Sequence, residues 1–191
     1  MENQSNFERK KDKIGVIHGR FQGLHLGHME FLLEGMRRCE HLYIGITNFD
    51  TTSEKPNTAN SHRLTKQANP FTFYDRLVMI RNSMIEAGIS TDRFDIIPFP
   101  IENPEKIYCY APADATYYLT IYDKWGEQKL NILKNLGLKT EVMWIRTDDT
   151  RITSGTEVRK LIEENKEWKH LVPGAVYEYV TNKLQQKDLT R

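Results

Sequence analysis

The chain of 191 residues is long enough for one domain with a sizeable core, and we expect no second catalytic domain. Hydrophobic residues make up 39% and charged residues 28%, which is usual for a folded protein and excludes general disorder. The net charge of +1 excludes a general attraction to nucleic acid, so any anion site must be local.

The N-terminal segment, residues 1–13, is polar and charged, so we expect a flexible tail and neither a signal peptide nor a membrane span. Residues 14–191 are then expected to form a single domain. Cys39 and Cys109 lie far apart and lack the spacing of metal ligands. This disfavours a zinc site or a disulfide framework and favours a reduced, cytoplasmic setting.

The first predicted elements are a strand, a loop and a helix. Residues 14–18 (IGVIH) form an apolar run typical of a buried strand, and the apolar spacing over 29–36 predicts a helix. The loop between them, residues 19–28, has the sequence GRFQGLHLGH. Such a junction collects backbone N–H groups and the positive end of a helix dipole, which suits a phosphate.

The side chains of this loop fit phosphate binding. Arg20 offers a fork of donors, Gln22 offers an amide, and the spacing of His25 and His28 lets both imidazoles face the mouth of the loop. Gly27 lets the backbone approach a ligand closely. A surface loop with two solvated histidines is the plainer alternative, but so many such groups within ten residues favour a binding loop.

A second apolar run, residues 42–46, gives a β–α–β start and therefore parallel strands. Residues 47–72 show no periodicity, which indicates either a lid over a functional site or a disordered loop. His62, Arg63 and Lys66 could reach phosphates from this segment, and a solvated mobile loop is an equally good interpretation.

The later pattern completes an α/β architecture. We expect a helix from about residue 69 to 88, strands at 94–98, 116–121 and 141–145, a polar turn at 101–110, and helices at 127–135 and 176–184. Five strands alternating with helices predict a doubly wound fold with a parallel five-stranded sheet and C-terminal helices. In such folds the ligand binds at the carboxyl ends of the strands.

A second candidate phosphate loop is SGTEVR, residues 154–159, at the start of a predicted helix. Ser154 or Thr156 can cap this helix while presenting a hydroxyl to phosphate, and Arg159 lies one turn further in. A simple capping box is the more frequent explanation for such a sequence when it occurs alone.

The two loops together carry a family resemblance. GRFQGLHLGH resembles the His-x-Gly-His signature of the nucleotidyltransferase superfamily, and GRFQ is similar to archaeal-type nicotinamide-mononucleotide adenylyltransferases. SGTEVR resembles the second signature of the same superfamily, and the likeness runs from about residue 14 to 183. Gly23 departs from it, because those enzymes usually carry proline there, and we expect the glycine only to loosen the loop.

The resemblance implies a Rossmann-like nucleotidyltransferase domain over 14–191 and roles for its residues. His25 and His28 would hold the α and β phosphates of a nucleoside triphosphate, and Arg20 and Arg159 the triphosphate and departing pyrophosphate. Mg²⁺ would be held mainly by substrate phosphates, with no metal ligands from the protein. The remaining expected nucleotide-binding residues are Gly19, Phe21, Gln22, Gly27, Ser154, Gly155 and Thr156.

The resemblance also suggests acceptor-binding residues. Arg76 would help to hold substrate, although a solvated helix arginine is the alternative. The relatives usually place a tryptophan on the nicotinamide ring, so Tyr108 or Tyr110 would have to stack on it here. Trp125 is a further candidate, with a role in the core or as a helix staple slightly favoured.

The expected reaction is adenylyl transfer from ATP to nicotinamide mononucleotide, giving NAD and pyrophosphate. A cytidylyltransferase acting on another phosphate or phosphonate monoester is the alternative, because the sequence from Glu102 to Trp125 departs most from the relatives. A protein of a different class, a nucleotide sensor without turnover, is disfavoured by the intact histidines and arginines. The expected partners are small molecules, and neither nucleic acid nor a membrane; relatives of this type are often oligomers, so a homo-oligomer stays open.

Overall fold

The computed structural model describes residues 10–50, 68–147 and 150–189. Its sheet has five parallel strands in the order β3-β2-β1-β4-β5. The strands are β1 (Asp12–Gly19), β2 (Cys39–Ile46), β3 (Phe94–Pro98), β4 (Thr116–Ile121) and β5 (Lys139–Ile145). The chain moves outward from β1 to β3 and then returns to place β4 on the other side of β1. This confirms the doubly wound prediction and puts the topological switch point between β1 and β4.

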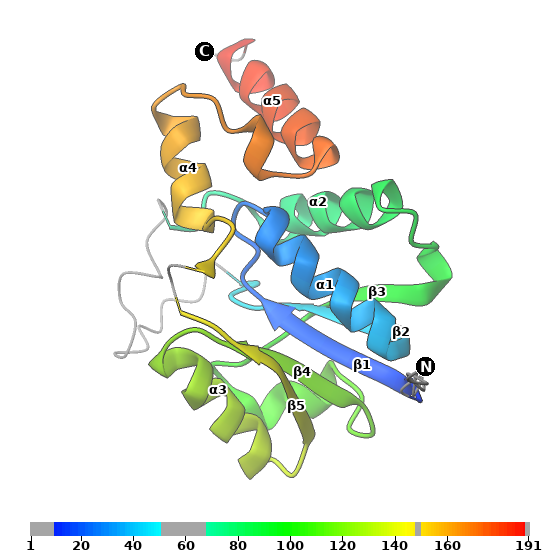
Figure 1. Ribbon diagram of the computed structural model, residues 1–191. Helices are drawn as coiled ribbons and strands as arrows, with labels where there is room; N and C mark the ends of the chain where they lie inside the picture. The colour runs from blue at the N-terminus through cyan, green and yellow to red at the C-terminus, as the bar shows by residue number, and fades with distance from the viewer. Residues whose placement is uncertain (1–9, 51–67, 148–149, 190–191) are drawn as a thin grey trace, which may run out of the picture.

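Helices cover both faces of the sheet (Figure 1). On one side lie α1 (Leu26–Arg38), α2 (Phe73–Glu86) and α5 (Gly174–Leu189), and on the other lies α3 (Lys124–Asn135). Helix α4 (Gly155–Glu163) follows β5, and the 3₁₀ turns of the described residues include η2 (Thr91–Arg93), η3 (Pro104–Cys109) and η5 (Lys169–Leu171). The polar turn predicted at 101–110 thus contains a short 3₁₀ helix.

The alternation of β1 side chains divides the core in two. Ile17 packs into the cluster under α1, α2 and α5, whereas Val16 packs into the cluster under α3. Both are fully buried, as expected for a central strand whose successive residues point to opposite faces. The next residue, His18, therefore lies on the α3 face of the sheet.

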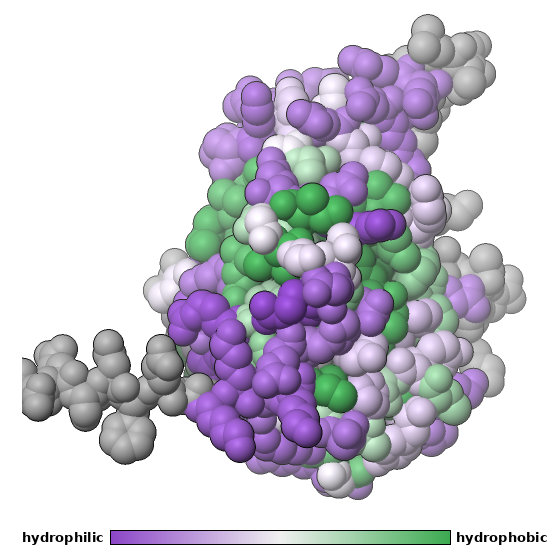
Figure 2. Space-filling model, turned by 90° about the vertical axis from the view of Figure 1, so that its right-hand side faces the viewer, coloured by the Kyte–Doolittle hydropathy of each residue, from purple (hydrophilic) through white to green (hydrophobic). Residues whose placement is uncertain are grey.

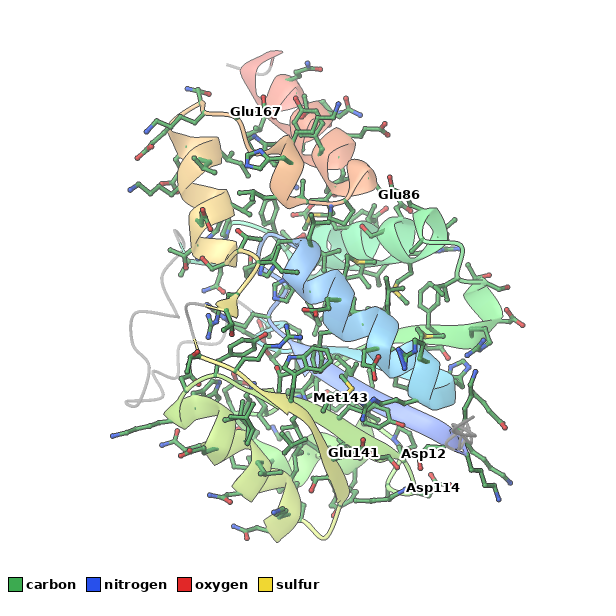
Figure 3. All side chains as sticks on the ribbon, viewed as in Figure 1. Asp12, Glu86, Asp114, Glu141, Met143 and Glu167 are labelled. Atoms are coloured by element: carbon green, nitrogen blue, oxygen red, sulfur yellow. The ribbon has the colours of Figure 1, made fainter. Side chains whose placement is uncertain are left out.

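The sheet begins earlier than the sequence indicated. Asp12 pairs with Cys39 in the β1–β2 register, accepts a hydrogen bond from the Tyr118 hydroxyl at 2.7 Å and forms an ion pair with Lys139 at 2.6 Å. The expected tail boundary at residue 13 is therefore wrong, because these contacts hold Asp12 in the sheet. Asp12 and Glu141 lie toward the same end of the sheet (Figure 3). Seen from this end, the surface is largely hydrophilic in its lower part (Figure 2).

The C-terminal helix α5 is fastened to α2 by polar contacts. Asp75 is 2% exposed, accepts a hydrogen bond from the Tyr179 hydroxyl at 2.6 Å, and pairs with Lys183. Glu86 points toward the start of α5 (Figure 3), where it accepts a hydrogen bond from the Ala175 amide. Among the described residues, no helix is long and apolar enough to cross a membrane.

Candidate active site

A cavity of about 520 Å³ opens at the carboxyl ends of the strands, beside the switch point between β1 and β4. Its lining comes from the loop after β1, the residues that follow β2 and β4, and the segment that leads into α4. Residues at the starts of helices α1, α3 and α4 line this cavity, so three helix N-termini lie at it. Each contributes free N–H groups and partial positive charge, which favours an anion.

The first signature loop builds the start of α1. His25 has extended backbone angles and caps the helix, because its Nδ1 accepts a hydrogen bond from the His28 amide at 3.3 Å. The two imidazoles stack with their centroids 3.7 Å apart, and Phe21 packs edge-on against His28. All three residues line the cavity, as does Gly27, as the sequence predicts.

Both imidazoles are neutral at neutral pH in this arrangement. Desolvation, followed by the charges of Arg151 and Arg159, lowers the pKa of His25 to about 4. Desolvation, with the neighbouring His25 and the surrounding arginines, also lowers the pKa of His28 well below its ordinary value. Because the His25 Nδ1 accepts a hydrogen bond, its proton lies on Nε2, which is a donor suited to a phosphate oxygen.

The second signature lies against the first. Ser154 is the cap of α4, since its hydroxyl oxygen accepts a hydrogen bond from the Glu157 amide at 3.1 Å. A Cβ on Gly155 would lie 2.7 Å from the Gln22 carbonyl oxygen, so only glycine allows this close approach of the two loops. Arg159 donates to the same carbonyl at 2.7 Å and to the Thr156 hydroxyl at 3.1 Å. The predicted meeting of the two signatures is therefore observed.

The side chain of Gln22, which the sequence predicts to bind the nucleotide, instead bonds to the protein backbone. It is 2% exposed, its Nε2 donates to the Phe71 carbonyl at 2.9 Å, and its Oε1 accepts from the Phe71 amide at 3.1 Å. Gln22 lines the cavity, but its amide is engaged with the backbone that leads into α2. It holds two loops together and is not placed to orient the triphosphate.

The Arg76 side chain also binds the protein backbone. It is fully buried, and its guanidinium donates to the carbonyls of Arg20, Thr47 and Asn48 at 2.8–2.9 Å and to that of Thr72 at 3.2 Å. It does not line the cavity. The structure therefore does not place Arg76 against the cavity as the sequence predicts, because its donors face backbone oxygens.

The predicted acceptor aromatics separate into two groups. Tyr108 donates its hydroxyl to the Leu136 carbonyl, and Tyr110 lies beside Phe49, with neither residue lining the cavity. The structure does not place either tyrosine at the cavity, since Tyr108 lies in η3 and Tyr110 directly follows it. Trp125 does line the cavity, and it packs partly against the core under α3.

Several cavity residues carry chemistry that the sequence did not single out. Arg151 lies over the Tyr122 ring at 4.3 Å, and Lys129 and His18 also line the cavity. The position of Arg151 three residues before SGTEVR was an available signal. No local pattern marks Lys129 or His18, which reach the site only through the packing of α3 and β1.

The charge of the lining favours an anion. Four cationic side chains line the cavity, namely Arg20, Lys129, Arg151 and Arg159, together with three carboxylates, Glu30, Glu102 and Asp123. Glu30 is paired with Arg146 through two contacts of 2.6 and 2.8 Å, and Asp123 caps α3. Within the described ranges, no group of three His, Cys, Asp or Glu side chains is arranged to hold a metal ion.

His62, Arg63 and Lys66, from the predicted lid, lie outside the described residues. The other predicted phosphate-binding residues, Gly19, Arg20, Ser154, Gly155, Thr156 and Arg159, all line the cavity.

Comparison with known proteins agrees with this geometry. The chain is 51% identical over 162 residues to phosphonoformate cytidylyltransferase from Streptomyces viridochromogenes, covering 85% of this chain and 87% of that protein. It is 30% identical over 166 residues to nicotinamide-nucleotide adenylyltransferase from Saccharolobus solfataricus, covering 87% and 88%.

A solved structure shares the fold. The bifunctional NMN adenylyltransferase/ADP ribose pyrophosphatase from Francisella tularensis superposes with a TM-score of 0.64 at 20% identity, covering 89% of this chain and 49% of that one. The chain thus spans about half the length of that protein. Residues 16–186 match the cytidylyltransferase-like family. With both signatures at one cavity, the chain belongs to this family of the His-x-Gly-His nucleotidyltransferase superfamily.

Proposed function

We propose that this protein transfers the cytidylyl group of CTP to a small phosphonate and releases pyrophosphate. The observation that carries the proposal is the 51% identity to phosphonoformate cytidylyltransferase over 85% of the chain. The adenylyltransferase likeness is weaker, at 30% over a similar length. Adenylyl transfer from ATP to nicotinamide mononucleotide, the reaction first expected from the sequence, therefore becomes the second candidate.

The cavity supports a compact, highly charged acceptor. Tyr108 and Tyr110 do not line the cavity. Under the adenylyltransferase hypothesis, one of them would have to stack on a nicotinamide ring. Glu102, Arg20 and Lys129 all line the cavity; desolvation raises the pKa of the Glu102 carboxyl, and the charges of Arg20 and Lys129 act on it in the opposite direction. A cationic end suits an acceptor with several negative charges in a small volume.

The reaction would need no general base. A phosphonate oxygen is already ionised near neutral pH and attacks the α-phosphorus of the triphosphate. The new P–O bond forms as the bond from the α-phosphorus to the α–β bridging oxygen breaks, and that oxygen leaves with its electron pair as part of pyrophosphate. Catalysis is then alignment of the two substrates together with stabilisation of the charge that develops on the leaving group.

The signature residues would supply that stabilisation. Neutral imidazoles of His25 and His28 donate to phosphate oxygens, and Arg159 and Arg151 neutralise the departing pyrophosphate. The N-terminus of α4, with Ser154, offers further donors. We propose that Mg²⁺ enters with the triphosphate and is held by its phosphates and water; when bound, it would neutralise phosphate charge.

Pyrophosphate release tests the proposal directly. The wild-type protein is assayed with each of the four nucleoside triphosphates against phosphonoformate, methylphosphonate, phosphate monoesters and nicotinamide mononucleotide. We expect the highest kcat/KM with CTP and a phosphonate. A preference for ATP with nicotinamide mononucleotide would establish the second candidate, and release with none of the pairs would favour a nucleotide sensor. His28→Ala serves as the control for contaminating activity.

A further inference from the structure

His18 is a buried polar residue that the proposed mechanism does not use. It is the penultimate residue of β1, only 5% exposed, and it lines the cavity. Neither ring nitrogen has a hydrogen-bond partner among the described residues. An apolar side chain would fill this place without leaving buried polar atoms unsatisfied, so the imidazole has a cost that packing alone does not explain.

The scaffold fixes the orientation of this ring. His18 stacks on Phe99 with the ring centroids 4.5 Å apart and 13° between the planes. Phe99 is fully buried, and it fits there because Gly45, the neighbour of His18 in the β1–β2 register, has no side chain. A Cβ on Gly45 would lie 2.8 Å from the Cβ of Phe99. His18 is thus held in one position before any ligand arrives.

The layout of the cavity puts His18 at the acceptor end. In an in-line displacement the attacking group and the leaving group lie on opposite sides of the α-phosphorus. His25, His28 and Arg159 mark the pyrophosphate side, on the face of the sheet that α1 and α4 cover. His18 stacks on Phe99 of the core cluster under α3, so in the proposed arrangement it lies on the opposite side of the α-phosphorus, where the acceptor would bind.

The chemistry of this end suits a second anionic group on the acceptor. Desolvation, with the charge of Lys129, keeps the pKa of His18 well below its ordinary value, so one ring nitrogen carries a proton and the ring is uncharged. Lys129 supplies the positive charge nearby. A directed N–H donor beside a cation matches a carboxylate better than an apolar or cationic group.

We propose that His18 is a specificity-determining residue whose imidazole donates a hydrogen bond to the carboxylate of a carboxylated phosphonate acceptor. This inference rests on the proposed function. It goes further in assigning to one residue the choice between phosphonates with and without a carboxylate.

The test compares phosphonoformate with methylphosphonate, which lacks the carboxylate, at saturating CTP. His18→Phe keeps the ring that stacks on Phe99 and removes both nitrogens, whereas His18→Asn keeps a donor near the same place. The same exchange at His41, a half-exposed histidine of β2 that contacts Asp95 and does not line the cavity, is the matched control. Melting temperature and the KM for CTP are measured for every variant.

For His18→Phe we expect kcat/KM for phosphonoformate to fall about 10- to 100-fold, the loss of one hydrogen bond to a charged group. The value for methylphosphonate and the KM for CTP should change less than about threefold, and His18→Asn should recover part of the preference. If His18→Phe does not fold, the ratio of the two acceptors in His18→Asn, compared with His18→Ala, carries the test.

Two failures are distinguishable. A wild-type protein that uses no phosphonate with CTP overturns the proposed function and this inference with it. A wild-type protein that prefers phosphonoformate, with a His18→Phe variant that keeps the preference, overturns the inference alone. Equal losses for both acceptors together with a raised KM for CTP would show a purely structural role, which also overturns it.

Discussion

The imidazole rings of His25 and His28 stack 3.7 Å apart at the start of α1, and the backbone amide of the second donates to the Nδ1 of the first. His25 therefore has two tasks, since it caps the helix and presents its Nε2 to the cavity. His28 has no part in the cap through its side chain, and its Nδ1 has no partner within the described residues. Replacing His25 is therefore expected to lower stability as well as activity, whereas replacing His28 is expected to lower activity alone.

His28→Ala should fold normally and turn over slowly. Because the cap depends on His25, we expect a melting temperature close to that of the wild type and binding of the triphosphate within a few-fold. Loss of one preorganised donor typically lowers kcat by about 10²–10³. Stopped assays of kcat with the preferred substrates, alongside His170→Ala as an exposed control, measure this. A near-normal kcat would remove His28 from the active site.

The stability of the protein should fall in mild acid. The pKa of His25 is about 4 in the folded protein against 6.5 for the ordinary side chain, so the unfolded chain binds more protons between these values. The free energy of unfolding is then complete above about pH 6.5 and decreases toward pH 4. His25 alone contributes roughly 3 kcal/mol over this range.

Urea unfolding at several pH values between 4 and 7.5 checks this dependence. His25→Asn retains a capping side chain and removes the titrating group, so its curve should be flatter than that of the wild type. Equal slopes for the two proteins would show that the pKa of His25 is the same in the folded and unfolded states.

The sequence located the strands well where an apolar run has polar boundaries. β3 (Phe94–Pro98) and β4 (Thr116–Ile121) begin and end as predicted. β1 and β2 begin earlier, because contacts across the sheet recruit polar residues such as Asp12. The contacts of Asp12 with Tyr118 and Lys139 join residues more than a hundred positions apart, and no local pattern reports them.

The two phosphate loops were predictable for a similar reason, since each concentrates its chemistry within ten residues. The role of Gln22 was not, because its partner Phe71 lies 49 positions away. The sequence analysis also expected Gly23, where the relatives usually carry proline, only to loosen the loop. Its φ of 80° is one that proline cannot adopt, so the loop takes a different turn here.

Arg76→Met should destabilise the fold and weaken substrate binding indirectly. The change removes the Arg76 donors of the buried Thr47 carbonyl and the part-buried Asn48 carbonyl, at about 1–3 kcal/mol for the buried one and less for the other. Because residues 47 and 48 line the cavity, KM for both substrates should also rise. Arg81→Met, at an exposed position of the same helix, is the control. A variant with wild-type stability and only a raised acceptor KM would restore Arg76 as a ligand residue.

Tyr108→Ala and Tyr110→Ala should leave the KM of both substrates unchanged, since neither side chain lines the cavity. Trp125→Ala should raise the acceptor KM by about two- to tenfold, the usual range for one aromatic contact, and lower the melting temperature. Steady-state kinetics on the three variants separate these outcomes. An increase confined to the tyrosine variants would mean that η3 moves to the cavity when the acceptor binds.

Gly155→Ala tests whether the contact between the two signatures matters for turnover. A Cβ at this position would meet the Gln22 carbonyl oxygen at 2.7 Å, so the start of α4 must move away from the β1–α1 loop. Arg159 would then lose its hydrogen bond to that carbonyl, and the donors on α4 would no longer face those on α1. Because alignment of the two sets is the main source of catalysis in the proposed mechanism, we expect kcat to fall by roughly 10²-fold with stability reduced by about 1–3 kcal/mol.

Gly137→Ala, at a turn with open space around it and far from the cavity, should lose stability through its φ of 73° but keep kcat. If both variants lose only stability, the close approach at Gly155 serves folding and not turnover.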